Sequence, residues 1–170
     1  MTAAADTRVP CLHLIAGLPC SGKTTYADAL SASTGAVLFT LDRWLITMFG
    51  RYSIGEVGQD EHTRRVLACR ELIWEVADQL LRRSVDVILD DGFFLRDHRV
   101  GFIEAAARAG VTVKTHFLDT PLEVIDARIQ ERNAKLPTFN FQIDPDALKF
   151  FAAWFQRPTP EEGAQIVIAS

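Results

Sequence analysis

A short segment between residues 17 and 25 combines glycine, lysine and hydroxyl side chains at a spacing that could hold phosphate groups. It reads Gly-Leu-Pro-Cys-Ser-Gly-Lys-Thr-Thr and matches G-x-x-x-x-G-K-[ST], the Walker A pattern. Gly17 and Gly22 allow backbone torsions that turn successive N–H groups toward a polyphosphate. Lys23 supplies a charge for the β- and γ-phosphates of ATP, and the Thr24 hydroxyl suits Mg²⁺. The residues expected to contact ATP in this segment are Gly17, Pro19, Cys20, Ser21, Gly22, Lys23, Thr24 and Thr25.

Aspartates follow several apolar runs, and one of them is suited to a metal ion. Asp90 closes the run Val-Ile-Leu-Asp in the manner of a Walker B carboxylate, which positions Mg²⁺ on phosphate groups. Thr24 and Asp90 are therefore the expected metal residues. The neighbouring Asp91 competes for the same role, and helix capping is the alternative explanation for Asp90.

Two further aspartates have different expected roles. Asp42 ends the second apolar run, where a carboxylate could accept the proton of an attacking hydroxyl, so it is the expected general base. The alternative is that Asp42 caps a helix over residues 43–49. Asp119 is followed at once by Thr-Pro, and helix capping is sufficient to explain it.

Two arginines could complete such a site. The segment Thr120–Glu123 has the pattern of a capping box with proline at the first helical position, and predicts a helix to about Ala134. Arg128 and Arg132 are four residues apart and share one face of that helix. A guanidinium presents a fixed fork of donors to the oxygens of a transferring phosphoryl group, so both arginines are expected to contact ATP. The alternative is a solvated helix face on which they pair with neighbouring carboxylates.

The elements that position these residues alternate between strand and helix. Apolar runs cover residues 11–16, 36–41, 85–89, 111–118 and 165–169, and helical patterns cover 61–83, 97–109, 121 to about 134 and 145 to about 155. The runs are continuous, as expected for strands covered on both faces. This alternation predicts an α/β fold with a mostly parallel sheet and helices on both faces. Ligands bind such sheets beyond the carboxyl ends of the strands.

Composition limits the partners. The chain has 170 residues, a size that fits one domain, and a formal net charge of -4 with no long basic run. An extended nucleic-acid groove is therefore disfavoured, because such binding draws on clustered Lys and Arg. No apolar run approaches the ~20 residues of a membrane span, and the N-terminus lacks a secretory signal pattern. We therefore expect a cytoplasmic protein with a small-molecule substrate, while the oligomeric state stays open.

Together these residues resemble the small P-loop kinases that include polynucleotide 5′-hydroxyl kinases, chloramphenicol phosphotransferase and zeta toxins, an AAA-type ATP-binding group. The resemblance implies a three-layer P-loop NTPase fold with a five-stranded parallel sheet of order 2-3-1-4-5, as one kinase domain over residues 1–170 with a small lid at about 128–142. It implies that Lys23 and Thr24 bind ATP and Mg²⁺, and that Asp42 is the general base. Arg128 and Arg132 would be lid arginines. With Asp42 and Lys23 they form the expected catalytic set.

The acceptor is expected between the ends of the second and third strands. The substrate-binding residues expected there are Asp42, Arg43, Trp44, Asp91, Phe93 and Arg96. Polynucleotide kinases have an arginine three residues after the base, whereas this chain has Leu45 there and an arginine at Arg43. The leading hypothesis is transfer of the γ-phosphoryl group of ATP to a hydroxyl of a small molecule. The alternatives are a polynucleotide 5′-kinase and a nucleotide-binding ATPase or switch without an acceptor.

Overall fold

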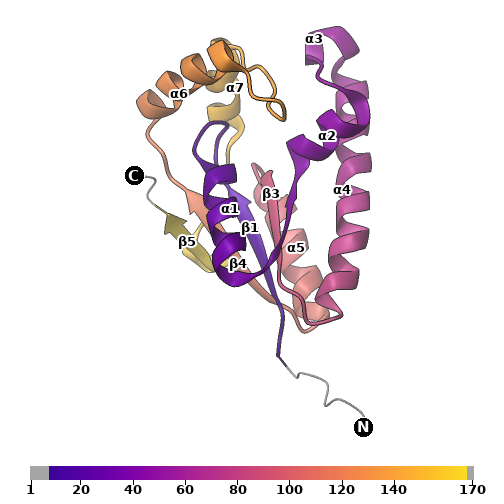
Figure 1. Ribbon diagram of the computed structural model, residues 1–170. Helices are drawn as coiled ribbons and strands as arrows, with labels where there is room; N and C mark the ends of the chain where they lie inside the picture. Colours follow the sequence, from indigo (N-terminus) through magenta and orange to yellow (C-terminus); the bar gives the residue numbers. More distant parts are fainter. Residues whose placement is uncertain (1–7, 168–170) are drawn as a thin grey trace.

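The computed structural model describes residues 8–167, except for the side chains of residues 145 and 146. Within this range one sheet of five parallel strands has the order β2-β3-β1-β4-β5 (Figure 1). The strands are β1 (Cys11–Ala16), β2 (Val37–Thr40), β3 (Val87–Gly92), β4 (Thr112–Leu118) and β5 (Ala164–Val167). The expected α/β class and strand order are therefore confirmed. Of the last predicted run, residues 168 and 169 lie outside the described part of the chain.

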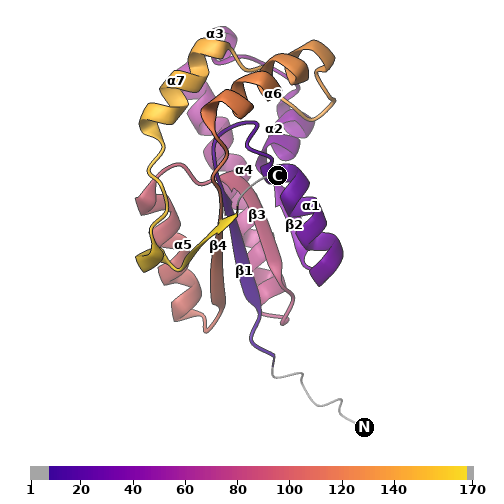
Figure 2. The same ribbon diagram turned by 90° about the vertical axis from the view of Figure 1, so that its left-hand side faces the viewer.

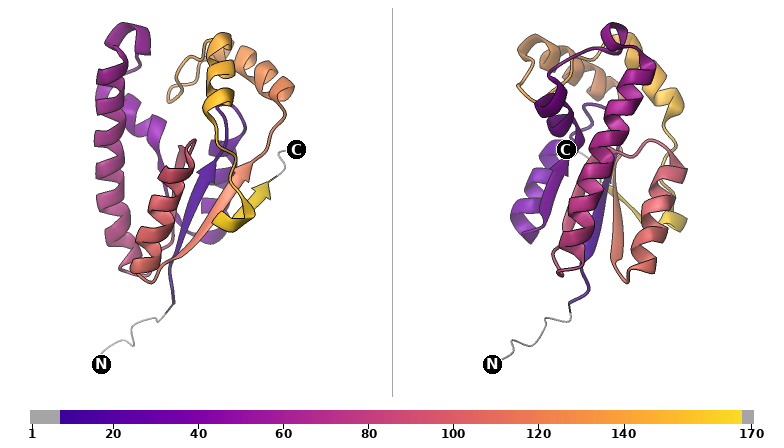
Figure 3. Two further views of the ribbon diagram at one scale, coloured as in Figure 1. Left: turned by 180° about the vertical axis from the view of Figure 1, so that it is seen from behind. Right: turned by 90° about the vertical axis from the view of Figure 1, so that its right-hand side faces the viewer.

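Helices cover both faces of this sheet. They are α1 (Lys23–Thr34), α2 (Leu41–Phe49), α3 (Ile54–Val57), α4 (Gln59–Leu81), α5 (Arg96–Arg108), α6 (Leu122–Lys135) and α7 (Pro145–Trp154), with a 3-10 turn η1 (Pro160–Glu162). Figure 2 shows α1 on one side of the sheet and α5 on the other, and Figure 3 shows α4 extending along the α5 side. Among the described helices, none is long and apolar enough to cross a bilayer.

The alternation of side chains along β1 explains the two cores. Leu12 and Leu14 are fully buried in the larger cluster, which includes residues of α4 such as Cys69 and Ile73. Ile15 points to the opposite face and packs in a second cluster that contains Ala27 of α1. A continuous apolar run is required because both faces of the strand are covered.

The register of the strands aligns the residues that precede the predicted site. Ile15 of β1 and Thr40 of β2 both pair with Asp90 of β3. The phosphate loop begins two residues after Ile15, and Asp42 lies two residues after Thr40. Because parallel strands share one carboxyl edge, all three segments lie at the same end of the sheet.

The start of α6 differs from the sequence prediction. The helix begins at Leu122 with Pro121 as its N-cap, and no side chain caps it. Thr120 does not form the predicted capping box, because its Oγ1 atom donates to the Ser21 carbonyl at 2.8 Å instead. The residues of the capping box are present, but the Thr120 hydroxyl bonds to an acceptor that is distant in the sequence. Helix α3, capped by a true capping box at Ser53, was not predicted.

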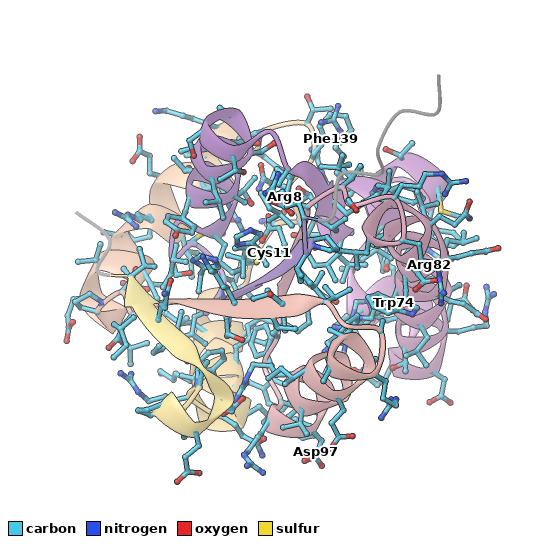
Figure 4. All side chains as sticks on the ribbon, turned by 90° about the horizontal axis from the view of Figure 1, so that it is seen from below. Arg8, Cys11, Trp74, Arg82, Asp97 and Phe139 are labelled. Atoms are coloured by element: carbon cyan, nitrogen blue, oxygen red, sulfur yellow. The ribbon has the colours of Figure 1, made fainter. Side chains whose placement is uncertain are left out.

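Two ion pairs lie near the two ends of the described part of the chain. At the amino edge, Asp86 accepts hydrogen bonds from the Arg8 side chain and the Cys11 N–H, and Arg8 and Cys11 are labelled in the view from below (Figure 4). Toward the other end, Arg99 of α5 forms a buried pair with Glu162, at 2.6 Å between Nε and Oε2. This pair fastens η1, and hence β5, to the body of the protein.

Candidate active site

The loop between β1 and α1 gathers backbone amides at the carboxyl edge of the sheet. Gly17 has a φ of +152°, and its N–H donates to the Gly92 carbonyl at 3.1 Å, which ties the loop to the end of β3. A Cβ atom on Gly17 would lie 2.7 Å from Ser21 Oγ, so a side chain there forces the loop to shift. Gly22, with a φ of +96°, is the N-cap of α1, and the loop therefore ends at the positive pole of a helix. Such a backbone is suited to an anion.

The inner part of the loop contains an unused polar group. Ser21 is fully buried, and among the described atoms its Oγ has no hydrogen-bond partner. Its carbonyl is held by Thr120, and Arg128 Nη1 lies 3.5 Å from the same oxygen, so α6 approaches the loop from one side. Buried hydroxyls without a partner are uncommon, so a polar ligand would satisfy this one. The other predicted loop residues are Pro19 and Cys20, half-buried in the loop, and Thr25, exposed on α1.

Lys23, Thr24 and Asp90 lie together at the start of α1 and the end of β3. Thr24 Oγ1 donates to Asp90 Oδ2 at 2.8 Å, and Lys23 Nζ donates to the Leu18 carbonyl of the loop at 2.7 Å. Burial lowers the pKa of Lys23, opposed by the carboxylates of Asp90 and Asp42. Burial also raises the pKa of Asp90, opposed by Lys23 and by the Thr24 hydroxyl. The hydroxyl and carboxylate oxygens form a hard donor pair of the kind Mg²⁺ accepts.

Asp91 faces a different partner from its neighbour. Arg70 of α4 binds it through two hydrogen bonds, Nε to Oδ2 at 2.7 Å and Nη2 to Oδ1 at 2.6 Å. This bidentate pair uses both carboxylate oxygens of Asp91 and fastens α4 to the end of β3. Burial raises the pKa of Asp91, and the hydrogen bonds from Arg70 oppose that shift.

Asp42 lies in the first turn of α2, and its side chain keeps contact with solvent. The surrounding protein nevertheless weakens its hydration and raises its pKa to about 6; Lys23 lowers the pKa and Asp90 raises it. Arg132 of α6 also acts on this carboxylate. An acid with a pKa near 6 is largely ionised at neutral pH and can still accept a proton, which is the property of a general base.

Arg132 connects α6 to this group of charges. Its Nη2 donates to the Phe141 carbonyl at 3.2 Å, while its Nε is buried and without a partner in the described structure. Its positive charge lowers the pKa of three neighbouring groups, Lys23, Asp42 and Cys20. A buried guanidinium N–H with no acceptor is costly, and a phosphate oxygen would supply one.

Arg43 and Trp44 lie on α2 next to Asp42. The guanidinium of Arg43 is exposed and lies 4.8 Å from the ring centre of Phe139, in the loop after α6. Trp44 is half-buried and packs on Phe39 of β2 with 6.0 Å between ring centres. Arg43 is thus directed toward the loop, and Trp44 partly toward the core.

Phe93 directly follows β3, and Arg96 begins α5. Phe93 is fully buried, and its ring meets Phe102 of α5 edge-on with 5.5 Å between centres. Arg96 is exposed at the first position of α5, where its backbone N–H donates to Gln156 Oε1. The structure therefore places Phe93 in the core and Arg96 at the exposed start of α5.

Arg70 and Thr120 contact the site but were not predicted from the sequence. Each reaches it through a long-range contact, with Asp91 and Ser21 respectively. One local signal existed for Arg70, because it follows Cys69, a buried member of the apolar stripe of α4. An arginine beside such a stripe can pack its aliphatic stem on the apolar surface and extend its guanidinium to a polar partner at the edge of the sheet.

Comparisons with known proteins agree with this architecture. The family described as an AAA domain matches residues 12–158. A Chloroflexus aurantiacus protein superposes with a TM-score of 0.75 and 19% identity, covering 95% of this chain and 89% of its own. A sugar kinase from Janibacter sp. gives 0.65 and 20% over 94% and 85%. The Mycobacterium tuberculosis APS kinase CysC, in complex with AMPPNP and APS, gives 0.57 and 18% over 95% and 89%. Among curated proteins a sequence search finds no match.

Proposed function

Since the chain belongs to the AAA domain family, we propose that it is an ATP-dependent kinase that transfers the γ-phosphoryl group to a hydroxyl of a small molecule. The observation that carries the proposal is the position of Asp42. The negative charge of its carboxylate raises the pKa of Lys23, and the charges of Asp90 and Arg132 shift the pKa of Asp42 in turn. These interactions support a proton acceptor close to the lysine that would bind phosphate. A protein that only binds or hydrolyses ATP has no need of this carboxylate on α2.

The chain's own residues account for the grip on ATP. The amides of residues 17–22 would bind the phosphates, and the buried Ser21 hydroxyl and Arg132 Nε have unused hydrogen-bonding capacity beside them. Lys23 Nζ donates a hydrogen bond to the Leu18 carbonyl, and on binding ATP it would exchange that neutral acceptor for phosphate oxygens. Charge-assisted bonds to phosphate are stronger than bonds to a carbonyl, so the exchange favours binding.

The residues also fit a magnesium ion. Thr24 and Asp90 would hold it, because their oxygens lie 2.8 Å apart at the end of the loop. Asp91 is occupied by Arg70, which favours Asp90 as the metal carboxylate. When bound, Mg²⁺ supplies positive charge to the phosphate oxygens as negative charge moves during the transfer.

In the proposed reaction the acceptor hydroxyl oxygen forms a bond to the γ-phosphorus while the bond from that phosphorus to the β–γ bridging oxygen breaks. ADP leaves with the electron pair of the broken bond, and the hydroxyl proton passes to the Asp42 carboxylate. Lys23, Arg128 and Arg132 would bind the equatorial oxygens and hold the phosphoryl group in line. The residues supply orientation, charge and one proton acceptor, which is what this reaction class requires.

The acceptor is expected to be small. The net charge of -4 disfavours a long nucleic-acid backbone, and two structures similar in fold carry the descriptions sugar kinase and APS kinase. Arg43 and Trp44 beside Asp42 would contact the acceptor, and their guanidinium and indole groups suit a polar molecule with one apolar face. We propose that residues 128–142, which are the end of α6 and the loop after it, form the lid over both substrates.

The test is a screen with ATP labelled at the γ-phosphate over sugars, other hydroxyl metabolites and 5′-hydroxyl oligonucleotides. Asp42→Asn should lower transfer by about 10²–10⁴-fold, because a neutral amide cannot accept the proton. Asp97→Asn is the matched control, since Asp97 is also an exposed aspartate in the first turn of a helix. Unchanged transfer in Asp42→Asn would refute the base assignment. Label on oligonucleotides alone would favour the polynucleotide kinase, and ATP turnover without any labelled acceptor, intact in Asp42→Asn, would favour the ATPase.

A further inference from the structure

The loop that follows α6 is held by three hydrogen bonds from Arg51, which lies on the opposite side of the site. Arg51, just after α2, donates from Nε to the Asn140 carbonyl at 3.0 Å and from Nη2 to the carbonyls of Pro137 and Thr138 at 3.0 and 3.1 Å. The turn is closed on itself by the Asn140 N–H, which donates to the Pro137 carbonyl at 3.1 Å. One guanidinium thus donates hydrogen bonds to three backbone oxygens of one turn. We call residues 137–141 the strap.

Side chains on both sides of Arg51 extend this contact. The Arg43 guanidinium lies over the Phe139 ring at 4.8 Å, and Tyr52 meets Phe141 edge-on with 5.2 Å between ring centres. These contacts join the strap to the segment at the end of α2. Planar guanidinium groups suit both carbonyl clusters and aromatic faces.

The other end of the strap is fastened to α6. Arg132 donates to the Phe141 carbonyl at 3.2 Å. The Asn133 side chain pairs with the backbone of Ile143 in both directions, donating to its carbonyl at 2.6 Å and accepting from its N–H at 3.1 Å. The helix that carries the proposed phosphate arginines therefore holds one end of the strap.

The strap thus connects the two sides of the proposed reaction site. α2 begins with Asp42 and is followed by Arg51, whereas α6 carries Arg128 and Arg132. In Figure 1 the loop after α6 extends from α6 and α7 toward α2. A connection of this kind sets the distance between the proton acceptor and the residues that grip phosphate.

We propose that Arg51 is a positioning residue that closes the strap over the reaction site, so that the phosphoryl group passes to the acceptor and not to water. The proposal rests on the kinase function proposed above. With the strap closed, the acceptor oxygen attacks the γ-phosphorus, ADP leaves and the proton passes to Asp42. With the strap open, a water oxygen makes the same attack and the products are ADP and phosphate. Exclusion of water by a closing loop is a general device for this choice.

The chemistry of the contact explains why arginine is needed. A guanidinium presents several N–H groups in one plane, and here two of its nitrogens reach three carbonyls. A lysine ammonium is a compact charge on a flexible stem and cannot reproduce that fork. Because the acceptors are backbone oxygens, the contact depends on the shape of the turn and not on its side chains.

The first measurement is amide hydrogen exchange of the unliganded protein over residues 136–144. Arg51→Ala should speed exchange there by roughly tenfold, the factor expected from losing a charged hydrogen-bond group at an exposed site. The amides of β1 and β4 should exchange as in the wild type, which shows that the fold is intact. Arg64→Ala is the matched control, because Arg64 is an exposed arginine whose bonds go to Glu61 of its own helix. It should leave the strap unchanged.

The second measurement is the ratio of phosphorylated acceptor to free phosphate formed from ATP, with the acceptor identified in the screen above. The ratio should fall roughly tenfold in Arg51→Ala, stay at the wild-type value in Arg64→Ala, and recover only in part in Arg51→Lys. An unchanged ratio, unchanged exchange, or full recovery with lysine would overturn the proposal, the last because it would identify a simple charge contact. If no acceptor is found the kinase function fails, while the exchange experiment still decides whether Arg51 holds the strap.

Discussion

The pH dependence of the reaction should reveal Asp42 directly. The surrounding protein weakens the hydration of Asp42 and raises its pKa from 3.8 to about 6, against the opposing charge of Lys23. At pH 7 the carboxylate is then about nine-tenths ionised and at pH 5 about one-tenth, so a rate that requires the ionised form falls about tenfold between them. With an ordinary aspartate the same change of pH would lower the rate by only about 6%.

Two assays can measure this pKa. The profile of kcat/KM against pH reports the free enzyme, and it should rise with unit slope to a plateau above pH 6. Carbon NMR of the aspartate carboxyl groups follows the same titration without a substrate, and the Asp42→Asn variant identifies the signal. A midpoint near 4 in both assays would refute the reasoning, because it would mean that the protein does not weaken the hydration of Asp42.

The same shift carries a consequence for stability. The folded-state pKa of Asp42 is raised, so the folded protein binds a proton more tightly than the unfolded chain between pH 4 and 6. Stability attributable to this group is therefore present below pH 4 and is lost as the pH rises through 6. Asp42→Asn should consequently have a higher Tm than the wild type at pH 7, and a smaller difference at pH 4. A lower Tm at pH 7 would contradict this sign.

Three further predictions concern a buried ion pair, the phosphate loop and a buried histidine. Arg99→Leu should lower the free energy of unfolding in urea by about 3–5 kcal/mol, because it leaves Glu162 buried without its partner, and replacing both residues by leucine should cost less; an unchanged midpoint would contradict this. Gly17→Ala should weaken ATP binding in a calorimetric titration, because a Cβ would lie 2.7 Å from a loop hydroxyl. Gly101→Ala in α5 should instead stabilise the protein by about 1 kcal/mol, because a Cβ there would meet no atom within 4 Å beyond the adjacent backbone of its own helix. Burial lowers the pKa of His116 from 6.5 to about 4, so its contribution to stability is present above pH 6.5 and is lost as the pH falls through 4; the loss should be roughly 3 kcal/mol in urea titrations and smaller in His116→Gln.

The parts of the site that lie within one short segment of the chain could be predicted from the sequence. The spacing of Gly17, Gly22 and Lys23 belongs to one turn, and the alternation of runs and helices was sufficient for the parallel sheet. The position of Asp42 near Lys23 also follows, because parallel strands bring their carboxyl ends to one edge. These features depend on backbone periodicity and glycine torsions, which short patterns encode.

The contacts that the sequence did not predict all join distant segments. Arg70 meets Asp91 across 21 positions, and Arg51 meets the strap across nearly 90. Such pairs depend on how helices pack on the sheet, which no short pattern encodes. Thr120 shows the converse case, because its local pattern was complete but its hydroxyl found a partner 99 residues away. Phe93 follows the strand end in sequence, and packing against α5 determines that its ring is buried.

The most direct test is a calorimetric titration of Mg·ATP into the wild type, Lys23→Ala and Lys114→Ala. Lys114 is the matched control, an exposed lysine near the amino end of β4, at the edge of the sheet opposite the phosphate loop. We expect that the wild type and Lys114→Ala bind alike and that Lys23→Ala binds at least about tenfold more weakly, the loss expected for one charged contact to phosphate. Equal affinity of all three proteins would contradict the claim that residues 17–24 hold the triphosphate.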